Sequence, residues 1–524
     1  MTATGISRSG WRRVGLGCLS GLILSLAFPP ANLTFLAFVG LVPLFFVLED
    51  LVRSPGARGG AFAAGWTAGL VYFAALLWWI VLLDAPALTI PWVRYPGTLA
   101  IVAYLGLYVG LFAFAYVWIR RRTAAPPWIV APALWTLSDL ARSYWELGFA
   151  WGHLGYSQVP FLPGLQVAAV AGIHGLTAWV VAINALVVAA MGGRRAVAWA
   201  AVVLAFAVPV ALGGLRVRNY EPRETVRVAL VQPNVGNDEK WDPNRRAAIF
   251  ETLSILTLDG AAQGAALVVW PETAAPCYLL KDREWLPHVE SLARSAGVPL
   301  FAGCPDYQIV REGGERRVRY SNSAAYFSAT GDLVDTMSKI ELVPFGERMP
   351  FSQFVGFLDR LDFGEADFMP GEGPVVFEFG ERRFGNLVCF EAIYPWLARD
   401  YARLGVDFLV NITNDSWFGA GSGARQHANM ALVRCVETGC GMARAANSGI
   451  SLAADAVGRT YSETPLFERR LAVVDVPLRS GTTFYTRAGD WVSVGAGLVS
   501  ALLVVAAIVG RPRRENRPPG GLVE

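Results

Sequence analysis

Three strand-like segments of the sequence end on side chains that can take part in covalent chemistry. They are A-L-V-V-W-P-E-T with Glu272, D-T-M-S-K with Lys339, and F-G-N-L-V-C-F-E with Cys389. A carboxylate held by a preceding proline suits a general base. A thiol between a strand and a helix-like run from Ala392 can feel the helix N-terminus, which lowers its pKa and favours the thiolate. A thiolate, a carboxylate base and a lysine are together what a thioester mechanism needs.

Each of these side chains also has a purely structural interpretation. Glu272 could cap a helix or sit in a solvated turn, Lys339 could lie on the surface, and Cys389 could be a buried core residue. The histidines show no paired spacing typical of a zinc site, so we expect no metal and no cofactor. A disulfide between Cys277 and Cys304 is one alternative if both residues lie on an oxidising side of a membrane.

The composition of the 524-residue chain indicates a membrane protein. Apolar residues make up 54% and charged residues 17%, and the mean hydropathy is +0.40. Disordered chains are poor in apolar residues, and six cysteines cannot staple a chain of this size. A net charge of +3 is too small for a nucleic-acid binder. The only lysines are Lys240, Lys281 and Lys339, so arginine supplies nearly all positive charge.

Apolar stretches predict eight transmembrane helices, since about 20 apolar residues span a bilayer. The predicted spans are Val14–Phe28, Leu33–Leu48, Gly60–Leu83, Gly97–Ile119, Trp128–Ala141, Gly164–Ala190, Ala196–Leu215 and Trp491–Val509. Arginines alternate between the loops, and the positive-inside rule then puts both termini in the cytoplasm. We therefore expect a membrane domain over 1–215, a domain over 216–490 on the far side, an eighth helix over 491–510, and a basic cytoplasmic tail over 511–524.

The segment 216–490 has the pattern of an α/β layered domain. Short β-rich runs alternate with helix-like stretches such as Arg245–Leu258 and Ala392–Leu404. The predicted strands are V-R-V-A-L-V-Q, A-L-V-V-W, P-L-F-A-G, F-G-N-L-V-C-F and D-F-L-V-N-I.

The order of Glu272, Lys339 and Cys389 resembles the Glu–Lys–Cys triad of the nitrilase superfamily, the carbon–nitrogen hydrolases. The motifs W-P-E-T-A, K-x-x-L-V-P-F-G-E, V-C-F-E and N-D-S-W-F-G, set between seven spans and one, are similar to bacterial apolipoprotein N-acyltransferases. F-A-W-G-H-L-G-Y-S-Q at 149–158 extends the resemblance into the membrane domain. The resemblance implies a polytopic α-helical membrane protein with an inserted αββα-sandwich.

The resemblance also implies roles for individual residues. Glu272 is the base, Lys339 stabilises the oxyanion and Cys389 is the nucleophile. Supporting or substrate-binding positions are Glu347, Glu391, Trp241 and Trp417. Phe390 stands where well-known relatives have tyrosine, so no phenol hydrogen bond is available there.

The implied activity is acyl transfer from a membrane phospholipid, through a Cys thioester, to the α-amine of the S-diacylglyceryl-cysteine of an apolipoprotein. The implied place is the bacterial inner membrane, with the catalytic domain on the periplasmic side. Two alternatives stay open: a membrane-tethered amidase that uses the same triad on water, and a transporter with a soluble sensor domain.

An apolar stripe soon after Glu347 suggests a helix that lies in the bilayer interface as an arm over the triad. A helix packed on the domain's own core is the equal alternative. The stripe consists of Phe351, Phe354, Val355, Leu358 and Leu361, followed by Phe363, Phe368 and Met369.

Overall fold

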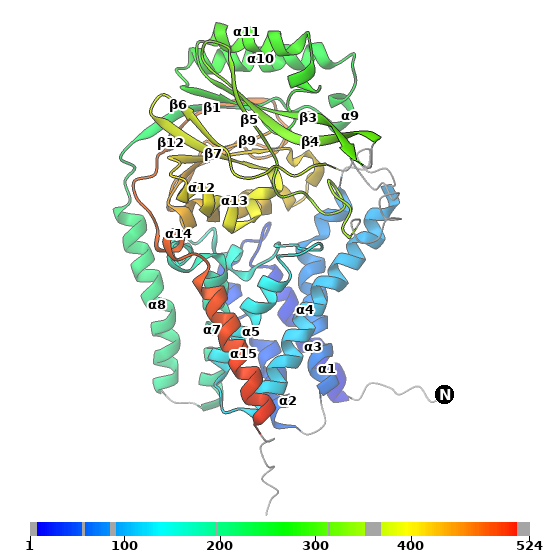
Figure 1. The fold of residues 1–524 in the computed structure, drawn as a ribbon. Helices are drawn as coiled ribbons and strands as arrows, with labels where there is room; N and C mark the ends of the chain where they lie inside the picture. The colour runs from blue at the N-terminus through cyan, green and yellow to red at the C-terminus, as the bar shows by residue number, and fades with distance from the viewer. Residues whose placement is uncertain are drawn as a thin grey trace, which may run out of the picture.

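A helical bundle and a two-sheet sandwich are stacked on one another in the computed structural model (Figure 1). The structure describes residues 8–54, 58–83, 91–193, 196–312, 315–351 and 368–510. Most of the predicted apolar arm, from Phe354 to Phe363, and the basic tail 511–524 lie outside the described residues.

Among the described residues, each predicted span contains a helix of the bundle. Its helices are α1 (Arg8–Ser25), α2 (Val42–Arg53) after the short η1 (Thr34–Phe38), α3 (Arg58–Leu76), α4 (Arg94–Arg122), α5 (Pro127–Ala141), α7 (Ala168–Gly193), α8 (Ala196–Asn219) and α15 (Trp491–Val509). Five helical segments among the described residues are long and apolar enough to cross a membrane: Thr34–Arg53, Arg94–Arg122, Ala168–Gly193, Ala196–Asn219 and Trp491–Val509. The third predicted span ends early, because α3 stops at Leu76 and a short helix η2 (Trp78–Leu82) follows it.

Glycines let the first helices approach one another closely. A Cβ atom on Gly65 of α3 would lie 2.5 Å from the Ala113 side chain of α4, and one on Gly69 would lie 2.8 Å from the Gly106 Cα atom. Gly21 of α1 has the same relation to the backbone of α3. Helix association in lipid depends on such close packing, since burial of apolar surface drives little there.

The sandwich consists of two six-stranded mixed sheets. The first has the order β12-β1-β2-β3-β4-β5 and the second β11-β10-β9-β8-β7-β6. The strands are β1 (Thr225–Gln232), β2 (Leu267–Val269), β3 (Leu300–Glu312), β4 (Glu315–Phe327), β5 (Leu333–Ser338), β6 (Val376–Phe379), β7 (Arg382–Val388), β8 (Phe408–Thr413), β9 (Gly441–Ala446), β10 (Leu452–Ala454), β11 (Thr460–Tyr461) and β12 (Arg470–Pro477). The expected strands therefore form, and their α/β layering is confirmed.

Helices cover both outer faces of the sandwich. α10 (Arg246–Ala262) and α11 (Trp285–Ala296) cover the first sheet. α12 (Pro395–Arg403) and α13 (Gly423–Thr438) lie between the second sheet and the bundle (Figure 1). Every residue of α13 except Arg425 is buried, although the helix carries Gln426, His427, Arg434 and Glu437. These polar groups therefore need partners from both domains.

The two domains are joined by hydrogen bonds as well as by apolar contacts. α7 is broken at Gly172, whose φ of +66° favours glycine, and a Cβ atom there would lie 2.4 Å from the Tyr485 ring. The Glu437 carboxylate of α13 accepts a hydrogen bond from the Ile173 N–H at the start of the resumed helix. α8 continues to Asn219 and β1 begins at Thr225, so the bundle extends a few residues beyond the expected end at 215.

Candidate active site

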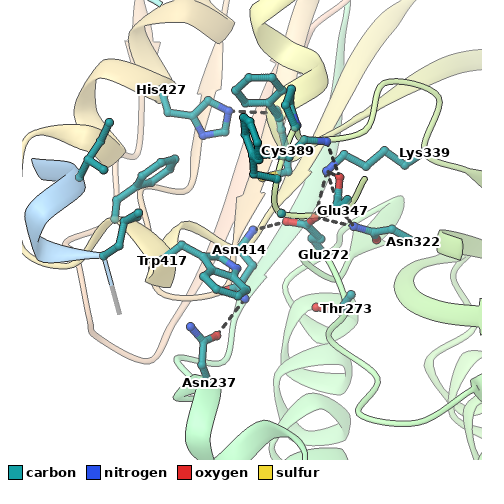
Figure 2. A pocket seen from close by; sticks show the side chains of 18 of the residues that line it. Asn237, Glu272, Thr273, Asn322, Lys339, Glu347, Cys389, Asn414, Trp417 and His427 are labelled. Carbon is teal, nitrogen blue, oxygen red and sulfur yellow. Dashed lines mark hydrogen bonds and ion pairs between the residues drawn. The ribbon is translucent and has the colours of Figure 1, made fainter. Parts of the chain in front are cut away.

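A cavity of about 540 Å³ lies between the sandwich and the bundle and contains the reactive side chains noted in the sequence (Figure 2). Strands β2, β5, β7 and β8 end beside it, since Glu272, Lys339, Cys389 and Asn414 follow them directly or within three residues. The bundle supplies an aromatic and aliphatic wall, formed by Trp79, Ile80, Leu83, Phe149 and Trp151. The cavity therefore joins a polar, reactive side to an apolar side.

The Glu272 carboxylate is held at both oxygens and is only 6% exposed. Its Oε1 atom accepts a hydrogen bond of 2.7 Å from the Asn322 amide of β4. Its Oε2 atom accepts one of 2.7 Å from the Asn414 backbone N–H, which follows β8. Because the two donors come from different sheets, the sandwich itself fixes the direction of this carboxylate.

Lys339 is buried between two carboxylates, with 1% of its surface exposed. Its Nζ atom lies 2.8 Å from a carboxylate oxygen of Glu347 and 3.7 Å from Oε1 of Glu272. Glu347 in turn accepts a hydrogen bond from the Val343 N–H at 2.9 Å. Burial acts to lower the pKa of Lys339, but Glu347 and Glu272 outweigh it and raise that pKa, so the ammonium keeps its charge.

Cys389 occupies a left-handed backbone conformation, with φ of +51°, between β7 and the short helix η8 (Cys389–Ile393). Such a conformation in a non-glycine residue persists only where its surroundings hold it. Burial and the nearby Glu272 raise the pKa of the thiol, and Lys339 opposes them without reversing the shift. The expectation that a helix N-terminus lowers this pKa is wrong, because desolvation and the carboxylate dominate.

Glu391 lies outside the cavity and joins two of its loops. Its carboxylate accepts hydrogen bonds from the N–H groups of Ile340 at 2.6 Å, Glu341 at 3.1 Å and Val388 at 2.6 Å. The segment after Lys339 is thereby tied to the segment before Cys389. Burial raises the pKa of Glu391 to about 7, although the three N–H donors act against this shift.

The other residues singled out in the sequence lie in or near the cavity. Trp241 and Trp417 both line it. Phe390 lines it as well, and its ring centroid lies 6.5 Å from that of Phe149 in the bundle. Cys277 and Cys304, by contrast, are free buried thiols that do not line it.

Three polar residues of the site were not assigned individual roles from the sequence. Asn322 holds Glu272 and also donates to Glu347 at 3.0 Å. Asn414 belongs to the motif N-D-S-W-F-G, which did signal its importance. His427, with no metal-like spacing to signal it, lines the cavity and contacts the Cys389 backbone.

The bundle wall of the cavity is itself held by the sandwich. Gln426 of α13 accepts hydrogen bonds from the indoles of Trp79 at 3.2 Å and Trp151 at 2.6 Å. The backbone before Trp151 is fixed by Arg142, which pairs with Asp139 and donates to the Phe149 carbonyl. Both indoles therefore have set positions opposite Cys389.

The fold and the site define a class of protein: a carbon–nitrogen hydrolase domain carried by a helical bundle. Residues 227–484 match the carbon–nitrogen hydrolase family. Among solved structures, an amidase from Nesterenkonia sp. covers 48% of this chain and 90% of its own, at 22% identity and a TM-score of 0.38.

The remaining comparisons identify the family within that class. Residues 20–186 match the Apolipoprotein N-acyltransferase N-terminal domain. The apolipoprotein N-acyltransferase of Geobacter metallireducens is 35% identical over 93% of this chain and 94% of its own. That of Chlorobaculum tepidum is 32% identical over 94% of this chain and 96% of its own. The chain therefore belongs to the apolipoprotein N-acyltransferase family.

Proposed function

We propose that the protein moves a fatty acyl chain from a membrane phospholipid to the N-terminal α-amine of a diacylated apolipoprotein, in two steps through a thioester on Cys389. One observation carries this proposal: Glu272, Lys339 and Cys389 meet in a cavity whose opposite wall is the membrane bundle. Both lipid substrates live in the bilayer, so a catalytic cavity that opens between bundle and sandwich is where they can meet.

In the first step Glu272 takes the thiol proton while the Cys389 sulfur attacks the ester carbonyl of the phospholipid. Because burial and Glu272 raise the thiol pKa, loss of this proton during the attack is favoured over loss before it. The charged Lys339 and the backbone N–H of Phe390 stabilise the oxyanion. The ester C–O bond then breaks, Glu272 returns the proton to the leaving alkoxide, and a lysophospholipid departs.

In the second step the α-amine of the lipid-modified cysteine attacks the thioester carbonyl. Glu272 accepts a proton from the amine, and the same two donors stabilise the second oxyanion. The C–S bond breaks, the sulfur regains its proton, and the new C–N bond makes an amide. Glu347 keeps Lys339 in place, and Glu391 keeps the loops of both residues together.

The arrangement of the helix ends supports a topology with the sandwich on the periplasmic side of the inner membrane. Arg13 at the start of α1 lies 3.5 Å from Asp50 near the end of α2, and Arg120 near the end of α4 pairs with Glu49. Arg122 donates to the Ala507 carbonyl near the end of α15. These arginine-rich ends share the side of the bundle remote from the sandwich (Figure 1), as the positive-inside rule requires of a cytoplasmic face.

The proposal is tested by the intact mass of the protein after incubation with phospholipid alone. We expect one added acyl chain, absent from Cys389→Ala and released as N-acylated product when a diacylated lipopeptide is added. Release of free fatty acid at the same rate without an acceptor would show a hydrolase instead. No mass increase in the wild-type protein would exclude the thioester route.

A further inference from the structure

A groove of about 730 Å³ lies on the outer side of the bundle, and we call it the flank groove. It is formed by α8, by α7 before its break at Gly172, by α14 (Phe484–Ala488) and by the start of α15. Among the described residues, none lines both this groove and the catalytic cavity. In Figure 1, α8 runs along one flank of the bundle, below the sandwich. The volume is typical of ligand sites, which hold about 300–1,000 Å³.

The helical walls of the flank groove are apolar and open to the surroundings of the bundle. Val208 and Leu212 of α8 and Val170 of α7 line it, and all three are exposed. Gly213 is the single buried residue of α8 among the described residues. Since α8 is long and apolar enough to cross a membrane, its exposed apolar surface meets acyl chains there and not water.

Arg216 marks the end of the groove that lies toward the sandwich. It follows Ala196, the first residue of α8, by about 20 residues, so the helix rises about 30 Å between them. That distance matches the hydrocarbon core of a bilayer and places Arg216 at the level of the lipid head groups. Trp491 and Tyr220 line the groove as well, and such aromatic residues are typical of the membrane interface.

The Arg216 guanidinium brings a positive charge to the groove. It is the single charged side chain among the described residues that line the groove, and it is partly exposed. It donates to the Gln166 side-chain oxygen at 3.0 Å and to the Ala456 carbonyl at 3.3 Å, which are neutral acceptors. The neighbouring Asp455 carboxylate pairs with Arg459 at 3.7 Å. A guanidinium with neutral partners, beside a bilayer, favours a phosphate ligand.

We propose that the flank groove binds one anionic phospholipid of the bilayer, with its phosphodiester on Arg216 and an acyl chain along Val208 and Leu212. The bound lipid is a structural ligand. It lies apart from the phospholipid that the catalytic cavity takes as acyl donor, and it is not consumed.

The polar groups at the mouth of the groove favour a head group that carries hydroxyls and no cation. Ser480 and Thr482 line the groove and are exposed, so their hydroxyls can bond to a phosphate or to a glycerol head group. An ethanolamine head group carries an ammonium, which Arg216 repels and which finds no carboxylate among the described lining residues. Phosphatidylglycerol therefore fits better than phosphatidylethanolamine.

The test measures lipid binding to the full chain in a neutral detergent. All binding variants carry Cys389→Ala, so that no added lipid is consumed. Arg216→Gln removes the charge, and its matched control is Arg218→Gln, which removes an exposed charge of the same helix outside the groove. Val208→Trp fills the apolar part, and its control is Val203→Trp, at an exposed position of α8 outside the groove.

We expect native mass spectrometry to show saturable binding of one dioleoyl phosphatidylglycerol, tighter than that of dioleoyl phosphatidylethanolamine. Arg216→Gln should weaken it about 10- to 100-fold, the usual effect of lost hydrogen bonds to a charged group, and Arg218→Gln less than about twofold. Val208→Trp should reduce occupancy, and Val203→Trp should not. The lipid should raise the thermal midpoint of the parent and of Arg218→Gln, but not of Arg216→Gln.

Equal affinities of Arg216→Gln and Arg218→Gln would overturn the inference, as would equal affinities for the two lipids. An equal rise of the midpoint with inorganic phosphate would assign Arg216 to a free anion and would also overturn it. If Arg216→Gln fails to fold, the comparison of Val208→Trp with Val203→Trp decides.

The catalytic reaction separates this inference from the proposed function. With Cys389 restored, Arg216→Gln should form the thioester at the wild-type rate, because the flank groove shares no described lining residue with the catalytic cavity. Slower thioester formation would make the groove part of the donor's route and would overturn its assignment as a separate site. A wild-type protein that forms no thioester would refute the proposed function and leave the binding result intact.

Discussion

The imidazole Nε2 atom of His427 lies 3.0 Å from the carbonyl oxygen of Cys389, so a buried histidine holds the backbone of the reactive cysteine. On its other side, His427 Nδ1 lies 3.0 Å from Asp415, which also accepts a hydrogen bond of 2.7 Å from Arg444. All three side chains are fully buried. Burial acts to raise the pKa of Asp415, but Arg444 and His427 outweigh it and lower that pKa. The row of hydrogen bonds from Arg444 through Asp415 and His427 thus holds the backbone of Cys389 in its left-handed conformation.

We expect His427→Phe to slow thioester formation about 10- to 100-fold. The change keeps an aromatic ring beside Trp151 but leaves the Cys389 carbonyl without its partner, while Asp415 keeps its hydrogen bonds from Arg444 and Thr413. A lost buried hydrogen bond costs about 1–3 kcal/mol. Because His427 positions the nucleophile, the loss should appear in the rate of thioester formation and not in the KM for phospholipid.

His427→Gln is the matched control, since its amide can donate to the Cys389 carbonyl. Partial recovery of the rate with Gln, at equal thermal stability of the two variants, would support positioning. Equal rates of thioester formation for His427→Phe and His427→Gln would show that His427 serves stability alone.

Removal of the Glu272 charge should affect alkylation and acylation of Cys389 in opposite directions. Glu272 raises the thiol pKa, so Glu272→Gln lowers it and increases the thiolate fraction at a given pH. We expect faster reaction of Cys389 with iodoacetamide at pH 7–8 and, because the base is gone, no measurable thioester from phospholipid.

The alkylation rate is followed by mass spectrometry at Cys389, with Cys389→Ala giving the background from the other cysteines. Slower alkylation in Glu272→Gln would mean that the carboxylate promotes thiolate formation at rest. The concerted proton transfer proposed here would then be wrong.

The apolar strands of the sandwich could be predicted because their signals are local. The runs before Glu272, Cys389 and Asn414 are short, β-rich and bounded by turn residues, and they became β2, β7 and β8. β9 escaped prediction, because G-M-A-R-A-A has small residues and a central arginine. Arg444 fits a buried strand only when Asp415 from another loop neutralises it.

The supporting groups of the site could not be predicted because their partners are distant in sequence. His427 has no metal-like spacing in the sequence, and its hydrogen-bond partner is the carbonyl of Cys389, 38 residues earlier. Gln426 binds the Trp79 indole across 347 residues. The thiol pKa depends on burial and on Glu272, neither of which the strand–helix pattern around Cys389 reveals.

The stability of the catalytic domain should depend on pH through Glu391. Burial raises its pKa from an ordinary value of 4.5 to about 7 in the folded protein. A raised pKa contributes stability below about pH 4.5, and that contribution is lost as the pH rises to about 7. The full shift corresponds to about 3 kcal/mol, so thermal unfolding in detergent should occur at lower temperature at pH 8 than at pH 5.

Glu391→Gln should remove this part of the pH dependence while lowering the midpoint at both pH values, because an amide cannot accept from all three N–H groups. Glu378→Gln, which alters an exposed ion pair with Arg383, is the control. A Glu391→Gln protein that keeps the wild-type difference between pH 5 and pH 8 would exclude Glu391 as its source.

The topology can be tested with a reporter that is active only in the cytoplasm. We expect no activity when it is fused near Gly380 in the sandwich and full activity when it is fused after Arg511. The arginine-rich ends of α1, α2 and α4 are the physical reason. Activity at Gly380 without activity after Arg511 would reverse the topology and remove the periplasmic substrate assignment.

Lys339 is one of three lysines in a chain that otherwise uses arginine for its positive charge. The ammonium is a compact charge with three donors, and it lies between Glu347 at 2.8 Å and Glu272 at 3.7 Å. A guanidinium is broader and planar and prefers to bind a carboxylate through two parallel hydrogen bonds. Lys339→Arg should therefore clamp Glu272 and block its proton transfer.

Loss of one oxyanion donor typically lowers the rate about 10²- to 10³-fold, and capture of the base adds to that loss. We expect Lys339→Arg to fold, to keep its thermal midpoint within a few degrees, and to form almost no thioester on Cys389 by intact mass. Lys339→Met removes the charge and so separates the effect of charge from that of shape. Because Lys339 acts to lower the pKa of the Cys389 thiol, Lys339→Met should also raise that pKa and slow alkylation by iodoacetamide. If Lys339→Arg acylates Cys389 at a rate near wild type, the residue supplies only positive charge, and its place in the oxyanion site is refuted.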